Sequence, residues 1–251
     1  MKKLTIILIL VLATVVVTSA FAPVAAAAKN PNPRVVPPTA SPYGYSYGEW
    51  GAKWWQWALG IPASINPLAD ESGDLVAVGQ SDRVWFLCGT IYFSPAPGGP
   101  DYAYEGVAER TCTIPTGKTL FFPIINVECS TAEGNGETVE ELTALCDFYM
   151  THATSLSVTV DGRPLKNLFA YRGTSGGYLL SWPDDDVLFG LPPLDEPTLS
   201  VSDGYWVMLP PLKVGQHTLH WTGRQEFTEA ADGFDGIFSQ DITYHLTVVP
   251  R

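Results

Sequence analysis

One stretch of the chain, residues 46–62, constrains the fold more than any other. It reads SYGEWGAKWWQWALGIP and holds four of the eight tryptophans in the sequence. Ser46 and Glu49 form a capping box that begins a helix, and Gly60 followed by Pro62 ends it. One helix of this length cannot bury so much aromatic surface by itself. The sequence therefore predicts a larger apolar surface that receives the helix.

The four indoles of this predicted helix do not share one face. Trp50, Trp54 and Trp57 are spaced at i, i+4 and i+7, so they lie on the same side. We expect this side to be packed in the core. Trp55 falls outside the spacing and points elsewhere.

The overall composition is that of a folded, turn-rich protein. Hydrophobic residues make up 46% of the chain and charged residues 16%, which is typical of a globular rather than a disordered protein. The 23 glycines and 21 prolines favour many short strands over long helices. The net charge of −12, without a local Lys/Arg cluster, argues against a nucleic-acid partner.

The first 28 residues have the pattern of a secretion signal. Two lysines precede an apolar run over residues 4–17. Small residues after this run are typical of a signal-peptide cleavage site, which could follow Ala28 or Ala20. An uncleaved membrane anchor is the alternative, and we favour it less because alanines dominate the end of the apolar run. The sequence thus predicts a protein secreted to the cell envelope or beyond, without membrane attachment after cleavage.

Four cysteines lie in the part of the chain expected to be exported. An even number of cysteines in an oxidising compartment predicts disulfides, and three pairings are possible. We favour Cys88–Cys112, between neighbouring strands, and Cys129–Cys146, between a loop and a helix. A zinc site needs closely spaced cysteine pairs such as C-x-x-C, which the sequence lacks.

Most of the remaining chain has strand patterns. A second helix is predicted over residues 138–150, where Thr138 and Glu141 form another capping box. Runs typical of strands cover residues 83–93, 110–114, 119–125, 155–160, 165–171, 178–182, 205–209, 217–221 and 242–249. We predict a mainly β fold, a β-sandwich of immunoglobulin-like or jelly-roll-like type, with the tryptophan helix and the second short helix packed on it.

The domain organisation follows from these patterns. Residues 29–42 are rich in proline and predict an extended spacer. Residues 43–251 are expected to form one domain. The alternative is an N-terminal lobe over residues 43–150 and an immunoglobulin-like lobe over residues 151–251.

Three segments carry a resemblance to a known group of proteins. They read YGEWGAKWWQWALGIP, TLFFPIIN and SDGYWVMLPPLKVGQHTLHWTG. In these segments the chain resembles a widespread group of secreted prokaryotic proteins without an assigned activity. The resemblance implies secretion and a β-rich fold, and it carries over no catalytic residue.

Two patterns suggest catalysis or zinc, and each has a simpler interpretation. Residues 173–177 match G-x-S-x-G around Ser175, but a strand rather than a helix follows, so a glycine-rich turn is favoured over a hydrolase nucleophile. His220 and His245 become neighbours on an outer face if their strands pair. Two histidines make an incomplete zinc site, so surface histidines are favoured.

Two acidic loops are candidates for calcium, although neither has the EF-hand spacing. Turn stabilisation by the aspartates is the simpler interpretation. The candidate ligands are Asp184, Asp185, Asp186, Asp232 and Asp235. No other cofactor is predicted.

The candidate ligand-binding residues are aromatic or polar side chains in apolar surroundings. Exposed aromatic rings can stack on sugars, and polar groups next to them can hydrogen-bond. These residues are Tyr45, Tyr47, Trp55, Asn126 and Glu128. We favour a non-catalytic secreted protein that binds a glycan or a cell-surface protein. The alternatives are a hydrolase with an acidic and aromatic pocket, or a structural subunit that pairs through the proline-rich arm or an edge strand.

Overall fold

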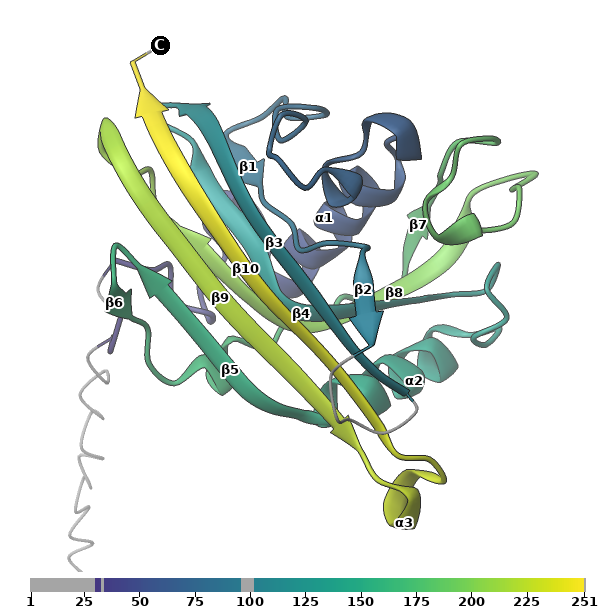
Figure 1. Cartoon of the computed structure of the whole chain (residues 1–251). Helices are drawn as coiled ribbons and strands as arrows, with labels where there is room; N and C mark the ends of the chain where they lie inside the picture. Colours follow the sequence, from purple (N-terminus) through teal and green to yellow (C-terminus); the bar gives the residue numbers. More distant parts are fainter. Residues whose placement is uncertain (1–29, 33, 96–101, 251) are drawn as a thin grey trace, which may run out of the picture.

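The computed structural model of the chain describes residues 30–32, 34–95 and 102–250. The predicted signal peptide, residues 1–28, lies outside the described residues. Two β-sheets pack against each other (Figure 1). The fold is therefore mainly β and sandwich-like, as predicted. Among the described helices, none has the length and apolar character needed to cross a membrane.

The smaller sheet has four strands and the larger has six. In spatial order, the smaller sheet contains β1 (Val84–Phe86), β4 (Thr119–Ser130), β8 (Thr198–Leu209) and β7 (Tyr178–Leu180). The larger contains β2 (Phe93–Pro95), β3 (Tyr102–Pro115), β10 (Gly236–Val249), β9 (Gly215–Phe227), β5 (Ala153–Val160) and β6 (Arg163–Pro164). The pairs β1–β4 and β3–β10 are parallel, and the other pairs are antiparallel.

The two long helices lie on opposite faces of the four-stranded sheet. The α-helices are α1 (Tyr47–Leu59), α2 (Val139–Thr151) and the short α3 (Glu229–Asp232). Five 3-10 turns cover Pro42–Gly44, Ala63–Ile65, Pro67–Ala69, Leu168–Tyr171 and Leu188–Gly190. Helix α1 packs on the face of β8 that carries Trp206. Helix α2 packs on the other face, where Cys146 meets Cys129 and Val201.

Helix α1 forms as the sequence predicts. The capping box between Ser46 and Glu49 is present, and the helix ends before Gly60. Trp50, Trp54 and Trp57 are only 7%, 1% and 8% exposed, so the prediction that they are core is confirmed. The Trp54 indole nitrogen donates to the Leu87 carbonyl oxygen at 2.8 Å, and the ring meets Trp206 at a centroid distance of 5.8 Å. Burial of three such rings anchors α1 to the sheet.

Two of the predicted strands differ from the structure. The run at residues 83–93 forms only three residues of β1, because the chain then crosses to β2 in the other sheet. The run at residues 165–171 forms a 3-10 turn, with Asn167 in the left-handed conformation (φ 55°) before it. A register shift after Pro123 in β4 lets a proline sit in a central strand.

The four cysteines are all free thiols and all buried, so neither predicted disulfide is present in the structure. The Cys88 sulfur lies 3.6 Å from the Tyr244 hydroxyl. Cys112 projects into the same core from β3, and its pKa is raised to about 12 by burial. The Cys129 and Cys146 sulfurs, in contrast, lie 2.8 Å apart. This second predicted pair is adjacent but reduced.

Candidate functional site

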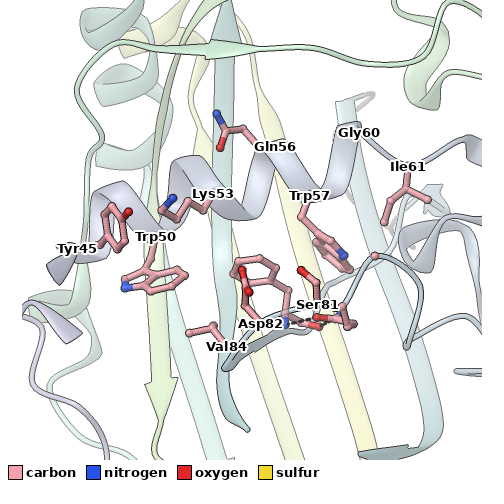
Figure 2. Close-up of a pocket in the computed structure, with 13 residues that line it drawn as sticks. Tyr45, Trp50, Lys53, Gln56, Trp57, Gly60, Ile61, Ser81, Asp82 and Val84 are labelled. Atoms are coloured by element: carbon pink, nitrogen blue, oxygen red, sulfur yellow. Dashed lines mark hydrogen bonds between the residues drawn. The ribbon is translucent and has the colours of Figure 1, made fainter. Parts of the chain in front are cut away.

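Two hollows flank the solvent-facing strip of helix α1. The first has a volume of about 460 Å³ and lies between α1 and residues 79–86. In Figure 2, Ser81, Asp82 and Val84 lie across this hollow from the helix. Its floor is aromatic, formed by Trp50, Trp57 and Phe86, and its rim is polar.

The second hollow lies on the other side of the same strip. Its volume is about 310 Å³, and residues 175–178 form its far wall. Both hollows are lined by Tyr45, Lys53 and Gln56, so they adjoin along this strip of the helix. We call the pair of hollows the α1 groove.

The side chains shared by both hollows are held in place by their neighbours. The Lys53 ammonium lies 4.2 Å from the centre of the Tyr45 ring, a cation–π contact. The Tyr45 ring packs edge-on against Trp50 at a centroid distance of 5.4 Å. Gln56 donates to the Leu179 carbonyl oxygen of β7 at 2.9 Å. The groove therefore presents a positioned aromatic ring, one cation and an amide.

The groove walls are fixed by backbone contacts rather than by loose loops. Gln80 accepts from the Phe86 backbone N–H at 3.0 Å and donates to the Phe86 and Val76 carbonyl oxygens. Ser175 accepts from the Ser202 backbone N–H at 2.8 Å and is 7% exposed. This bond ties the G-x-S-x-G segment to β8 and supports its interpretation as a structural turn.

The predicted ligand-binding residues separate into three places. Tyr45 lines the groove and is 39% exposed. Tyr47 is 2% exposed, so it cannot serve as a stacking platform. It is the first residue of α1, and its hydroxyl donates to the Val36 carbonyl oxygen at 2.6 Å and accepts from the Met208 N–H. Trp55, Asn126 and Glu128 are half-buried and line neither hollow.

Glu128 lies in a polar environment on β4. Its carboxylate accepts a short hydrogen bond from the Ser200 hydroxyl. Burial raises its pKa to about 9, and the neighbouring carboxylate of Glu133 adds to the shift. Glu133 itself accepts from the Ser130 hydroxyl at 2.7 Å. Burial beside Glu133 therefore favours the neutral, protonated form of the Glu128 side chain.

The raised pKa of Glu128 predicts a pH-dependent stability. The pKa of Glu128 is higher in the folded protein than in the unfolded chain. Its favourable contribution to the free energy of unfolding is therefore complete below the unfolded pKa and is lost as the pH rises toward 9. Glu128→Gln mimics the neutral acid. In urea titrations, the free energy of unfolding of the wild type is expected to fall between pH 5 and 8. Glu128→Gln is expected to make this fall smaller by about 1 kcal/mol per pH unit. Parallel stability curves for wild type and Glu128→Gln would contradict this, and the exposed Glu140→Gln is the control.

The calcium candidates serve as turn stabilisers. Asp186 accepts from the Ser64 backbone N–H and hydroxyl, and Asp235 accepts from the Glu229 N–H. Asp232 accepts from the Thr228 N–H and contacts His152. Asp184 and Asp185 are exposed. Within the described ranges, no group of three or more His, Cys, Asp or Glu side chains is placed to hold a metal ion.

The two strand histidines lie on one face of the paired strands β9 and β10, but each has its own carboxylate partner. His220 contacts Asp241 at 2.8 Å, and His245 contacts Glu109 at 2.8 Å. Their cross-strand partners are Thr243 and Thr218, so the histidines are diagonal neighbours. The arrangement is that of two separate surface hydrogen bonds, each between a histidine and a carboxylate.

Sequence reasoning missed most of the groove. A signal was present on α1, where Glu49, Lys53 and Gln56 repeat at i, i+4 and i+7, one residue before each of the three core tryptophans. This polar stripe marks the solvent-facing strip of the helix. The other walls come from residues 79–86 and 175–178, and nothing in the sequence placed these segments beside α1.

Comparisons with known proteins give no assignment. No protein-family model and no curated protein matches the chain. Among solved structures, the chain is similar to the cysteine protease inhibitor EhICP2 from Entamoeba histolytica, with 14% sequence identity and a TM-score of 0.20. The match covers 60% of this chain and 100% of that chain. It is also similar to PbICP-C in a complex with falcipain-2 (10% identity, 65% and 98% covered, TM-score 0.19). A third similar structure is amebosin (10% identity, 59% and 99% covered, TM-score 0.16). Likenesses this distant carry no argument about function.

Proposed function

We propose that the chain is a secreted, non-catalytic binding protein of the cell envelope and that the α1 groove binds a glycan. The observation that carries this proposal is the groove itself, which combines a partly exposed tyrosine, an aromatic floor and a hydrogen-bonding rim. Secretion rests on the sequence pattern of residues 1–28. The first hollow of the groove, of about 460 Å³, lies within the usual range for small-ligand sites.

The chemistry of the groove suits a neutral sugar. A pyranose ring has an apolar face that stacks on an aromatic ring and a rim of hydroxyls that need hydrogen-bond partners. Tyr45 offers the ring, while Lys53 and Asp82 offer a donor and an acceptor on opposite sides of the first hollow. A strongly anionic glycan is disfavoured, because the protein carries a net charge of −12.

The proposal predicts binding that depends on the shared groove residues. In a screen of neutral oligosaccharides followed by calorimetric titration, we expect Tyr45→Ala and Lys53→Ala each to weaken binding by about tenfold or more, since each removes roughly 1–2 kcal/mol of contact. Phe169→Ala removes an exposed aromatic ring outside the groove and is the matched control.

Two results would contradict the proposal. One is equal binding by Tyr45→Ala, Lys53→Ala and the wild type. The other is recovery of a cleaved oligosaccharide after incubation, which would make the protein a hydrolase.

We also propose that export oxidises one cysteine pair. The adjacent sulfurs of Cys129 and Cys146 support a disulfide there, whereas Cys88 and Cys112 lie in the core between the sheets.

A further inference from the structure

The two hollows of the α1 groove lie on either side of one exposed ridge of the helix. Lys53 and Gln56, which are neighbours at i and i+3, line both hollows, and we call this pair the crest. Because an α-helix with its side chains is about 10–12 Å across, a ligand that reaches both hollows must extend over roughly this distance. A single pyranose ring is shorter than that, whereas a chain of sugars is long enough.

The second hollow has a far wall that is fixed against the helix and the sheet. A Cβ atom added at Gly48 of α1 would lie 2.0 Å from the Thr174 carbonyl oxygen, so the chain that leads into this wall packs directly on the helix. The Gly173 N–H donates to the Gly204 carbonyl oxygen of β8 at 2.9 Å. Both sides of the hollow are therefore in place before a ligand arrives, which lowers the free-energy cost of binding.

The far wall of the second hollow has little side-chain bulk. Gly176 and Gly177 are both exposed, and a Cβ atom added at Gly176 would have no neighbour within 4 Å. Two glycines let a ligand approach the main chain closely, where the peptide groups can hydrogen-bond its hydroxyls. The space beside Tyr178 is therefore open to a sugar ring.

The charges that line the two hollows are balanced in the same way. Asp82 lines the first hollow, Glu49 lines the second, and Lys53 lines both. The Glu49 carboxylate is held in the capping box, where it accepts from the Ser46 N–H at 2.7 Å and from the Ser46 hydroxyl at 2.8 Å. Each hollow thus offers a donor and an acceptor to hydroxyl groups, and neither has the excess of positive charge that an acidic sugar needs.

We propose that the α1 groove binds a linear neutral oligosaccharide that crosses α1, with one sugar in each hollow and at least one more over the crest. This inference rests on the proposed function and specifies the form of its glycan. The first hollow has the aromatic floor and holds the sugar that binds most strongly. A chain long enough to reach the second hollow makes its further contacts within the same complex, so chain length raises the affinity.

The test measures affinity as a function of chain length. Cello-, xylo-, manno- and malto-oligosaccharides of two to six sugars are titrated calorimetrically into the wild-type protein. For the series that binds most tightly, we expect the affinity to rise about tenfold or more from the disaccharide to the tetrasaccharide. Further sugars extend beyond both hollows and are expected to change the affinity by less than about threefold.

A variant that fills the second hollow gives the matched comparison. Gly176→Trp places an indole in the open space beside Tyr178, and we expect it to reduce the gain from disaccharide to tetrasaccharide to less than about threefold. Val214→Trp adds an indole at an exposed position that lines neither hollow, and it is expected to keep the full gain. Urea unfolding checks that both variants are folded.

The outcomes separate this inference from the proposed function. Equal affinities of the wild type for all chain lengths would overturn the crossing mode and leave a glycan site in one hollow. A full gain with chain length in folded Gly176→Trp would also overturn it, because the second hollow would then be dispensable. Binding of a single-sugar or branched glycan, with none of the four linear series bound, would overturn it as well. Failure of every neutral glycan to bind would overturn the proposed function itself.

Discussion

Replacement of Arg110 by alanine is expected to lower the free energy of unfolding by about 3–5 kcal/mol, because a large buried side chain and its three hydrogen bonds are lost. Arg110 lies on β3 and is 1% exposed in the core between the sheets. Its guanidinium donates to the carbonyl oxygens of Asp70 at 2.6 Å and Cys88 at 3.0 Å and to the Tyr244 hydroxyl at 3.0 Å. Loss of the side chain leaves both a cavity and unpaired oxygens.

The same arginine holds a loop in place. The Asp70 carboxylate accepts from the backbone N–H groups of Ser72, Gly73 and Leu75, so the bond from Arg110 to the Asp70 carbonyl ties an ordered turn to the sheet. Urea unfolding of Arg110→Ala measures the effect, and Arg224→Ala, an exposed ion-pair member, is the control with an expected change of at most about 1 kcal/mol. A stability of Arg110→Ala within about 0.5 kcal/mol of wild type would contradict this account of the core.

Oxidation of the pair Cys129 and Cys146 is expected to stabilise the protein by about 3 kcal/mol, the value for a cross-link that closes a loop of about 15 residues. The two residues are 17 apart in sequence, and their sulfurs lie 2.8 Å apart between β4 and α2. With oxidised glutathione as the oxidant, the two thiols lose two protons and two electrons, and a sulfur–sulfur bond forms. Thiol counting before and after oxidation, together with urea unfolding, measures both the bond and its effect.

The controls for the disulfide use the other cysteines. The double variant of Cys129→Ala and Cys146→Ala is expected to show no gain in stability with oxidised glutathione. The Cys129 and Cys146 sulfurs already lie 2.8 Å apart, whereas the Cys88 sulfur contacts the Tyr244 hydroxyl, so Cys88 and Cys112 are expected to remain reduced. Four free thiols in the exported protein, or a bond that includes Cys88, would contradict the prediction.

Local sequence signals predicted the helices well because each signal acts within a few residues. The capping boxes at Ser46 and Thr138 form as predicted, and the tryptophan spacing correctly identified the core face of α1. Tyr47 shows the limit of such signals. It alternates with Tyr43 and Tyr45 in the sequence, but helix α1 begins at Tyr47 and turns its ring inward.

Features that depend on distant segments were out of reach. The α1 groove joins residues 45–61 with residues 79–86 and 175–178, and only the sheet topology places these segments together. Arg110 is an intermediate case. In the structure it shares the buried phase of Ala108, Cys112 and Ile114 along β3, an alternation that is present in the sequence but was not used to place Arg110 in the core. Its partners, Asp70 and Cys88, became visible only in the structure.

Hydroxyl-radical footprinting with mass spectrometry tests most directly whether the α1 groove is the binding surface. The protein is oxidised alone and with the neutral oligosaccharide that binds most tightly in the screen, and the modification of each aromatic side chain is compared. We expect the ligand to protect Tyr45, which is 39% exposed, and to leave Tyr102 and Tyr92, at 60% and 49%, unchanged because they lie outside the groove. Unchanged oxidation of Tyr45 with protection of Tyr102 or Tyr92 would place the ligand elsewhere and contradict the account.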